Sequence, residues 1–135
     1  MQVKFWRQAA VAVGLAAGAV GAGACAAAAV AGAAGAIYAT TRGVESLVAS
    51  PIDRVVSSSE SVMKDLGIVQ DATSSDNGGA KRELKGKHGD LDVTIQMEQQ
   101  DTATTKVEVY ARKNLAEWDK DYARTVLDKI IHAAK

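Results

Sequence analysis

The sequence contains very few of the residues that form disulfides and metal sites. Its 135 residues include one cysteine, Cys25, and two histidines, His88 and His132. A single cysteine excludes a disulfide within the chain. Neither histidine has a second His or Cys at a ligand spacing, so we predict that both are solvated and that the chain holds no metal.

Residues arranged for catalysis are also missing. A Ser-His-acid site needs a serine on a sharp turn, but the serines at 57–61 fall in a predicted helix, where we expect a solvated face. Residues 77–79 (NGG) are too short for a phosphate-binding loop and do not lead into a helix. We therefore predict no catalytic residue, no cofactor and no enzymatic activity.

The chain has no excess charge of either sign. It carries 16 basic and 16 acidic side chains, for a formal net charge of zero. Domains that bind nucleic acid are usually strongly basic, so we predict no nucleic-acid partner. One local basic set is present, formed by Lys81, Arg82, Lys85 and Lys87. Its sequence fits either a solvated sheet face or a contact with an anionic surface, such as lipid headgroups or an acidic partner.

A long uncharged stretch occupies residues 9–39 and consists of 17 Ala, 6 Gly and a few larger apolar residues. Lys4 and Arg7 precede it, as in the basic start of a secretory signal. Residues 9–20 then match the apolar region of such a signal, and the small residues 22–24 stand directly before Cys25.

This arrangement resembles the lipobox of bacterial lipoproteins, with Ala22 where that family usually has Leu. The resemblance implies a signal peptide over 1–24 and a lipidated Cys25 that carries palmitate. By composition, the Ala/Gly-rich remainder of 25–39 fits a flexible tether or a small-residue helix that packs against another copy or lies on the membrane. The resemblance implies attachment to a bacterial envelope membrane through this lipid. Ala26, in place of Asp, implies the outer membrane, with the domain facing the periplasm.

Two alternatives remain for the same stretch. An uncleaved membrane helix is long enough, because about 20 apolar residues span a bilayer. Gly14 and Gly18 have the GxxxG spacing of packed membrane helices, although Ala and Gly bury little apolar area. The other alternative is a cleaved, soluble exported protein. In each case, the basic residues at the start place the C-terminal part outside the cytoplasm.

Residues 40–135 predict one small α+β domain. The β-branched segment 37–48 predicts a first strand, and Ser50 is a suitable N-cap for a helix that Gly67 ends. Four strands follow, at 68–73, 80–87, 91–98 and 105–112. The strand 91–98 is the clearest because apolar and polar residues alternate throughout it.

The last predicted helix begins near Asn114, with Glu117 as a capping-box partner. Leu115, Trp118 and Tyr122 lie on its apolar side and predict core contacts. The resulting order is β-α-β-β-β-β-α, which predicts a two-layer sandwich of an antiparallel sheet with two helices on one face.

The strand-to-helix segment SPIDRVV (50–56) and the helix end DLG (65–67) resemble an uncharacterised family of small bacterial lipoproteins with a domain of unknown function. The resemblance covers about residues 25–131 and implies export and a lipid anchor. It implies no reaction, cofactor or catalytic residue. We therefore expect a non-catalytic binding or scaffolding role with an envelope protein partner, and leave the oligomeric state open.

The alternative function is a carrier that holds an apolar ligand between the sheet and the helices. Its mark would be a cavity lined by Met63, Met97 and Trp118 with a few polar groups.

Overall fold

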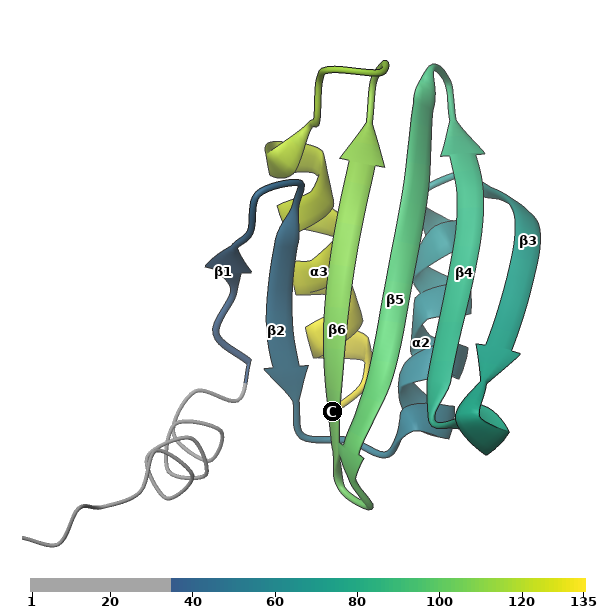
Figure 1. The fold of residues 1–135 in the computed structure, drawn as a ribbon, viewed down its shortest axis with the longest axis vertical. Coiled ribbons are helices and arrows are strands. Elements are labelled where there is room, and N and C mark those ends of the chain that lie inside the picture. The colour runs from purple at the N-terminus through teal and green to yellow at the C-terminus, as the bar shows by residue number, and fades with distance from the viewer. Residues whose placement is uncertain (1–34) are drawn as a thin grey trace, which may run out of the picture. The chain divides into compact units, whose positions relative to one another are not determined.

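The computed structural model of the chain describes residues 35–135, so Cys25 and the predicted signal peptide lie outside the described residues. It shows one antiparallel sheet with two helices packed on one of its faces (Figure 1). The elements in chain order are β1 (Tyr38–Ala39), β2 (Val44–Val48), α2 (Ile52–Asp65), β3 (Val69–Asp76), the 3-10 turn η1 (Asn77–Gly79), β4 (Lys81–His88), β5 (Leu91–Asp101), β6 (Thr104–Arg112) and α3 (Lys120–Ala133).

The sheet has six strands in the order β1-β2-β6-β5-β4-β3, all antiparallel to their neighbours. The predicted α+β sandwich with its antiparallel sheet is therefore confirmed. The strand with the clearest alternation, β5, lies in the middle of the sheet beside β6, as its pattern predicts. Val93 and Ile95 of β5 are 1% and 0% exposed.

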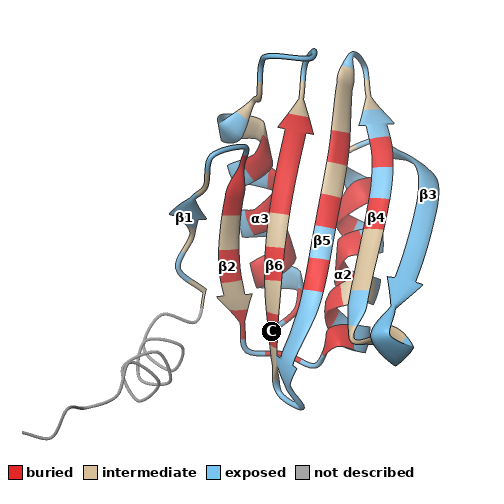
Figure 2. Cartoon of the chain, in the orientation of Figure 1, coloured by how far each residue is buried: buried red, intermediate tan, exposed pale blue. Residues whose placement is uncertain are grey.

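The core lies between the sheet and the helices, and alternation in the strands produces it. Every second residue is buried over 93–97 of β5 and over 105–111 of β6, where Tyr110 is buried as well, and this contributes the red bands of these strands in Figure 2. The helix α2 packs against β4 and β5, α3 packs against β6 and β2, and the helices contact each other. The largest fully buried side chains come from α2, β4, β5 and α3: Met63, Leu84, Ile95, Met97, Leu127 and Ile130.

The predicted first strand, 37–48, is divided by a tight turn at Thr40–Gly43. Thr40 N donates to Gly43 O at 2.9 Å, and Gly43 N donates to Thr40 Oγ1 at 2.9 Å. Gly43 itself lies directly on β6, where a Cβ would be placed only 2.0 Å from the carbonyl oxygen of Val109. Only glycine allows this approach, so the chain turns where the sequence pattern predicts a continuous strand.

Ser50 does not cap α2, which corrects the predicted N-cap. The cap position is Pro51, and its carbonyl oxygen accepts from Val55 N at 3.1 Å. The Ser50 hydroxyl instead donates to Ala134 O at 2.8 Å, across 84 residues of sequence. Thr105 Oγ1 donates to Ser50 O at 2.9 Å, so Ser50 connects the start of α2 to β6 and to the end of α3.

The predicted end of the first helix at Gly67 is confirmed. Gly67 has a φ of 74°, the left-handed conformation that favours glycine after a helix. Ile68 N then donates back to Met63 O at 2.8 Å and closes the helix end.

The serines of α2 are only partly solvated, which corrects another prediction. Ser58 is 8% exposed and Ser59 is fully buried. The Ser59 hydroxyl lies 3.7 Å from Met97 Sδ. These small side chains let the middle of α2 approach the sheet closely.

The last helix begins at Lys120, six residues later than predicted. Asn114 Oδ1 does accept backbone hydrogen bonds, from Ala116 N at 2.9 Å and Glu117 N at 3.1 Å, but they close a turn that is not continued as a helix. The cap of α3 is Asp119, whose Oδ1 accepts from Tyr122 N at 2.9 Å. Leu115, predicted in the core, is 90% exposed.

The described chain enters the domain at Gly35, whose N–H donates to Leu47 O at 2.7 Å. The compact unit that contains the sheet spans Ala33–Lys135, so it includes residues assigned to the tether from sequence. Neither helix in the described part of the chain has the length and apolar character needed to cross a membrane.

Candidate functional site on the open face of the sheet

One face of the sheet has no helix on it, and we call it the open face. Its side chains come from the strand positions that alternate with the core positions. Four strands supply most of them: Glu45 and Leu47 from β2, Lys81, Glu83, Lys85 and Lys87 from β4, Asp92, Thr94, Gln96 and Glu98 from β5, and Lys106, Glu108, Tyr110 and Arg112 from β6.

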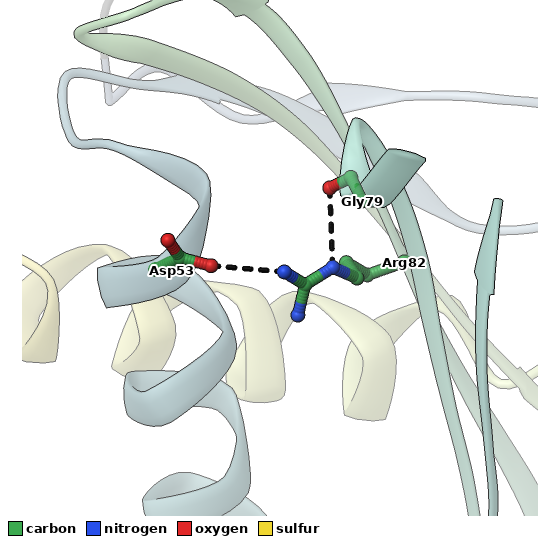
Figure 3. A network of polar contacts seen from close by, with 3 residues as sticks. All are labelled: Asp53, Gly79 and Arg82. Atoms are coloured by element: carbon green, nitrogen blue, oxygen red, sulfur yellow. Dashed lines mark hydrogen bonds and ion pairs between the residues drawn. The ribbon is translucent and has the colours of Figure 1, made fainter. Parts of the chain in front are cut away.

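The basic set predicted as an anionic-surface contact is divided between two faces. Lys81, Lys85 and Lys87 lie on the open face, whereas Arg82 alternates with them and points to the helix side. Arg82 Nη2 binds Asp53 Oδ1 of α2 at 2.9 Å, and its Nε donates to Gly79 O at 3.1 Å (Figure 3). The contact thus stays a prediction for the three lysines only.

Two of these lysines have carboxylate partners. Lys85 Nζ lies 3.4 Å from Glu83 Oε1, and Lys87 Nζ lies 2.8 Å from Asp92 Oδ1. The hydrogen bond from Lys87 holds the pKa of Asp92 below its ordinary value, and the same bond raises the pKa of Lys87. Much of the positive charge on β4 is therefore locally compensated.

A different group of side chains gathers at one corner of the open face: Arg42, Tyr110, Arg112 and Trp118, here called the Arg–aromatic cluster. The Arg42 Cζ atom lies 4.9 Å from the ring centroid of Tyr110 and 5.7 Å from that of Trp118. The Arg112 Cζ atom lies 6.0 Å from the Trp118 centroid. The two aromatic rings meet edge to face at 6.0 Å. These distances are those of cation–π contacts.

Three separate segments assemble the Arg–aromatic cluster. The turn before β2 carries Arg42, and β6 presents Tyr110 and Arg112 two residues apart on one face. Trp118 reaches that face because its backbone forms an antiparallel bridge with Arg112. Hydrogen bonds on either side of the bridge, from Lys113 N to Glu117 O and from Asp119 N to Ala111 O, hold it in place.

Tyr110 joins the cluster to a polar network on the neighbouring strands. Its hydroxyl donates to Gln96 Oε1 at 2.6 Å, and Glu108 Oε1 lies 3.3 Å away as an alternative acceptor. Gln96 Nε2 donates in turn to Glu83 Oε2 at 2.7 Å. Burial, followed by the nearby Glu108 carboxylate, raises the pKa of Tyr110 to about 12. The hydrogen bonds of its hydroxyl therefore fix the position of the Tyr110 ring.

The structure separates the aromatic residues that the sequence places together in the core. Trp118 lies on the open face, so its predicted core position is wrong. Tyr122 does pack against the core, and it stacks on His88 with centroids 5.2 Å apart. His88 is consequently half-buried, which corrects its predicted solvation, whereas His132 is exposed.

The cavity expected of an apolar carrier is not formed by the residues predicted for it. Met63 and Met97 are each 1% exposed within the packed core, and Trp118 is on the opposite side of the sheet. These three side chains do not line a common cavity. Across residues 35–135, no three His, Cys, Asp or Glu side chains are grouped so that they could hold a metal ion.

The Arg–aromatic cluster borders an open depression of about 360 Å³ on the sheet, which also includes Lys85, Asp92 and Thr94. Its chemistry is that of recognition, because guanidinium groups and aromatic rings bind carboxylates and planar groups. The alternation in β6 could have shown that Tyr110 and Arg112 share a polar face. Arg42 has no such signal, because it lies in a turn outside any periodic segment.

Comparison with known proteins finds no matching family model and no similar curated protein.

Proposed function

We propose that the chain is an exported, lipid-anchored protein of the bacterial envelope that binds a protein partner and has no catalytic role. The anchor is Cys25, and the lipoprotein resemblance of the residues before it supports this assignment. Its lipid holds the domain at the outer membrane on the periplasmic side.

The open face of the sheet carries the binding role. The helices bury a continuous core on the other face, whereas the open face carries charged side chains with the partly exposed Trp118 and the buried Tyr110 beside them. Arginine and aromatic residues are enriched where proteins bind one another. The Arg–aromatic cluster is the single observation on which this half of the proposal rests.

The place where the chain enters the domain agrees with anchoring. Gly35 lies beside Leu47, near the end of β2, and a Cβ at Gly35 would lie 3.8 Å from Cγ2 of Ile131 in α3. Arg42 precedes the other end of β2. The described chain therefore enters the domain at the end of β2 opposite to the end that Arg42 precedes.

Labelling cells with a palmitate analogue tests the anchor. The wild-type protein should incorporate the label, and the Cys25→Ser variant should not, because the acylated sulfur is lost. The mature mass should change as well, since lipoprotein processing depends on this cysteine. A wild-type chain that remains membrane-bound at full length without label would refute the anchor in favour of an uncleaved span.

Site-specific photocrosslinking tests the binding face. A photoreactive residue at Thr94 on the open face should form a discrete adduct in intact cells, and one at Glu60 on the exposed side of α2 should not. Equal yields at the two positions, or adducts only from Glu60, would refute the open face as the binding surface.

A further inference from the structure

We propose that the open face binds a polypeptide segment that places a carboxylate on Arg42 and Arg112 and a basic side chain on Glu45 and Glu108. This inference rests on the proposed binding function and names the partner's chemistry. It is argued from the charges that the domain leaves without partners.

No carboxylate lies within 4.0 Å of the two guanidinium groups of the Arg–aromatic cluster in the described domain, and Asp92, which is opposite Arg112 in the register, is paired with Lys87 instead. Neither Arg42 nor Arg112 forms an ion pair within 4.0 Å or a side-chain hydrogen bond there. The part of the chain outside the described residues cannot supply one from an acidic side chain, because the first acidic residue of the sequence is Glu45. The N–H donors of these two arginines are therefore available to a carboxylate from another molecule.

The aromatic rings restrict the arginines without using their hydrogen-bonding capacity. A guanidinium group over a ring makes its contact through the face of the group, and its N–H donors lie in the plane. Trp118 contacts both arginines and is itself fixed by the bridge to Arg112. The donors are thus partly ordered before a ligand arrives, which lowers the entropy lost on binding.

A second charged group, without an ion-pair partner in the described domain, begins four residues from Arg112 on β6. Glu45 of β2 and Glu108 of β6 are directly opposite in the register. Like charges at such positions destabilise a sheet, and neither carboxylate forms an ion pair with the basic residues of the described domain. A lysine or arginine from a partner would relieve this repulsion.

The two charge groups together favour a polypeptide over a polyanion. Glu108 and Arg112 are four residues apart on one strand, or roughly 13 Å at the usual rise per residue. A phosphate-rich ligand that reached the arginines would also face Glu45, Glu108 and Asp92. An extended segment with acidic and basic residues four positions apart matches both groups at once.

The test uses the full-length chain in a non-ionic detergent with Trp6→Phe, so that Trp118 is the only tryptophan. Its fluorescence is titrated with the end-blocked peptide Glu-Thr-Ser-Thr-Lys and with versions that carry Gln for Glu or Gln for Lys. We expect millimolar binding of the first peptide and about tenfold weaker binding of each Gln version, as for charged hydrogen bonds.

Protein variants locate the two contacts. Arg42→Gln or Arg112→Gln should weaken binding of the parent peptide about tenfold, but should not further weaken binding of the peptide with Gln for Glu. Glu108→Gln should likewise weaken binding of the parent peptide, but not of the peptide with Gln for Lys. Arg42→Lys should also lose affinity, because an ammonium lacks the planar fork. Arg54→Gln, on the exposed side of α2, is the matched control and should bind as the wild type.

Three outcomes would overturn the proposal. One is the absence of peptide binding to a wild-type protein that is shown to be folded by its melting transition. Another is equal affinity for the Glu and Gln peptides. The third is tighter binding of inorganic phosphate at the same arginines, which would assign the cluster to a phosphate ligand. None of these outcomes depends on Cys25, so failure here is distinguishable from failure of the lipid anchor.

Discussion

Replacing Gly43 with alanine tests whether the turn that carries Arg42 lies directly on β6. The new Cβ would fall 2.0 Å from the Val109 carbonyl oxygen and 3.1 Å from the Cα of Tyr110. All of these neighbours are backbone atoms of a central strand, which cannot rotate away as a side chain can. The turn itself must therefore move off the sheet and take Arg42 with it.

The magnitude follows from the nature of this clash. Overpacking a well-packed site destabilises a protein by about 1–3 kcal/mol, and contact with fixed backbone belongs at the upper end of that range. The compact unit Ala33–Lys135 is close to the size for which 1 kcal/mol shifts Tm by about 4–8 °C. We therefore expect Gly43→Ala to lower Tm by roughly 12–24 °C.

Thermal unfolding followed by circular dichroism measures this effect, and Thr41→Ala in the same turn is the matched control. Thr41 is exposed, so its truncation should change stability by no more than about 0.5 kcal/mol. In the Trp6→Phe background, Gly43→Ala should also shift the emission of Trp118, because Arg42 leaves its ring. If Gly43→Ala has the Tm of the wild type and the same Trp118 emission, the close approach of the turn to β6 is refuted.

Three further predictions concern the core, the buried polar contacts and the open face. Ile95→Asp places a carboxylate at a fully buried site and should destabilise by on the order of 3–5 kcal/mol in chemical denaturation, whereas Gln99→Asp at an exposed position of the same strand should have little effect. Ser50→Ala removes the hydroxyl that donates to Ala134 O and should destabilise by about 1–3 kcal/mol, measured in the same way. Tyr110 has a folded pKa of about 12, above its ordinary value of 10.0, so its contribution is complete below pH 10 and should be lost as the pH rises toward 12. Tyr110→Phe should remove that part of the pH dependence of unfolding, and an unchanged alkaline profile would contradict the assignment.

The strands of this domain are predictable because their signal is local. Every second residue is apolar over 91–97 of β5 and 107–111 of β6, and a strand whose two faces differ needs no distant information to be recognised. The same holds for the end of α2, where Gly67 terminates the apolar spacing. The sheet with helices on one face then follows from the need to bury one side of each element.

The errors occur where a distant contact replaces a local one. Ser50 has the right chemistry for a helix cap, but its hydroxyl donates a hydrogen bond to the carbonyl oxygen of Ala134, which is distant in sequence. Trp118 and Tyr122 have helical spacing, yet pairing with Arg112 keeps Trp118 extended. No pattern near Ser50 or Trp118 shows which long-range partner is available, so local signals assign these two residues to the wrong environment, whereas Tyr122 packs against the core as predicted.

Alternation also explains why Arg82 does not share a surface with the three lysines that are its neighbours in the sequence. Arg82 follows Lys81 directly, but a strand sends neighbouring side chains to opposite faces, so Arg82 pairs with Asp53 of α2 while Lys81 stays on the open face. The same rule fixes the Arg–aromatic cluster. A shift of β6 by one residue would turn Tyr110 and Arg112 under the helices and expose Val107 and Val109. Burial of those valines therefore determines which side chains the open face presents, and the core and the proposed binding surface depend on a single register.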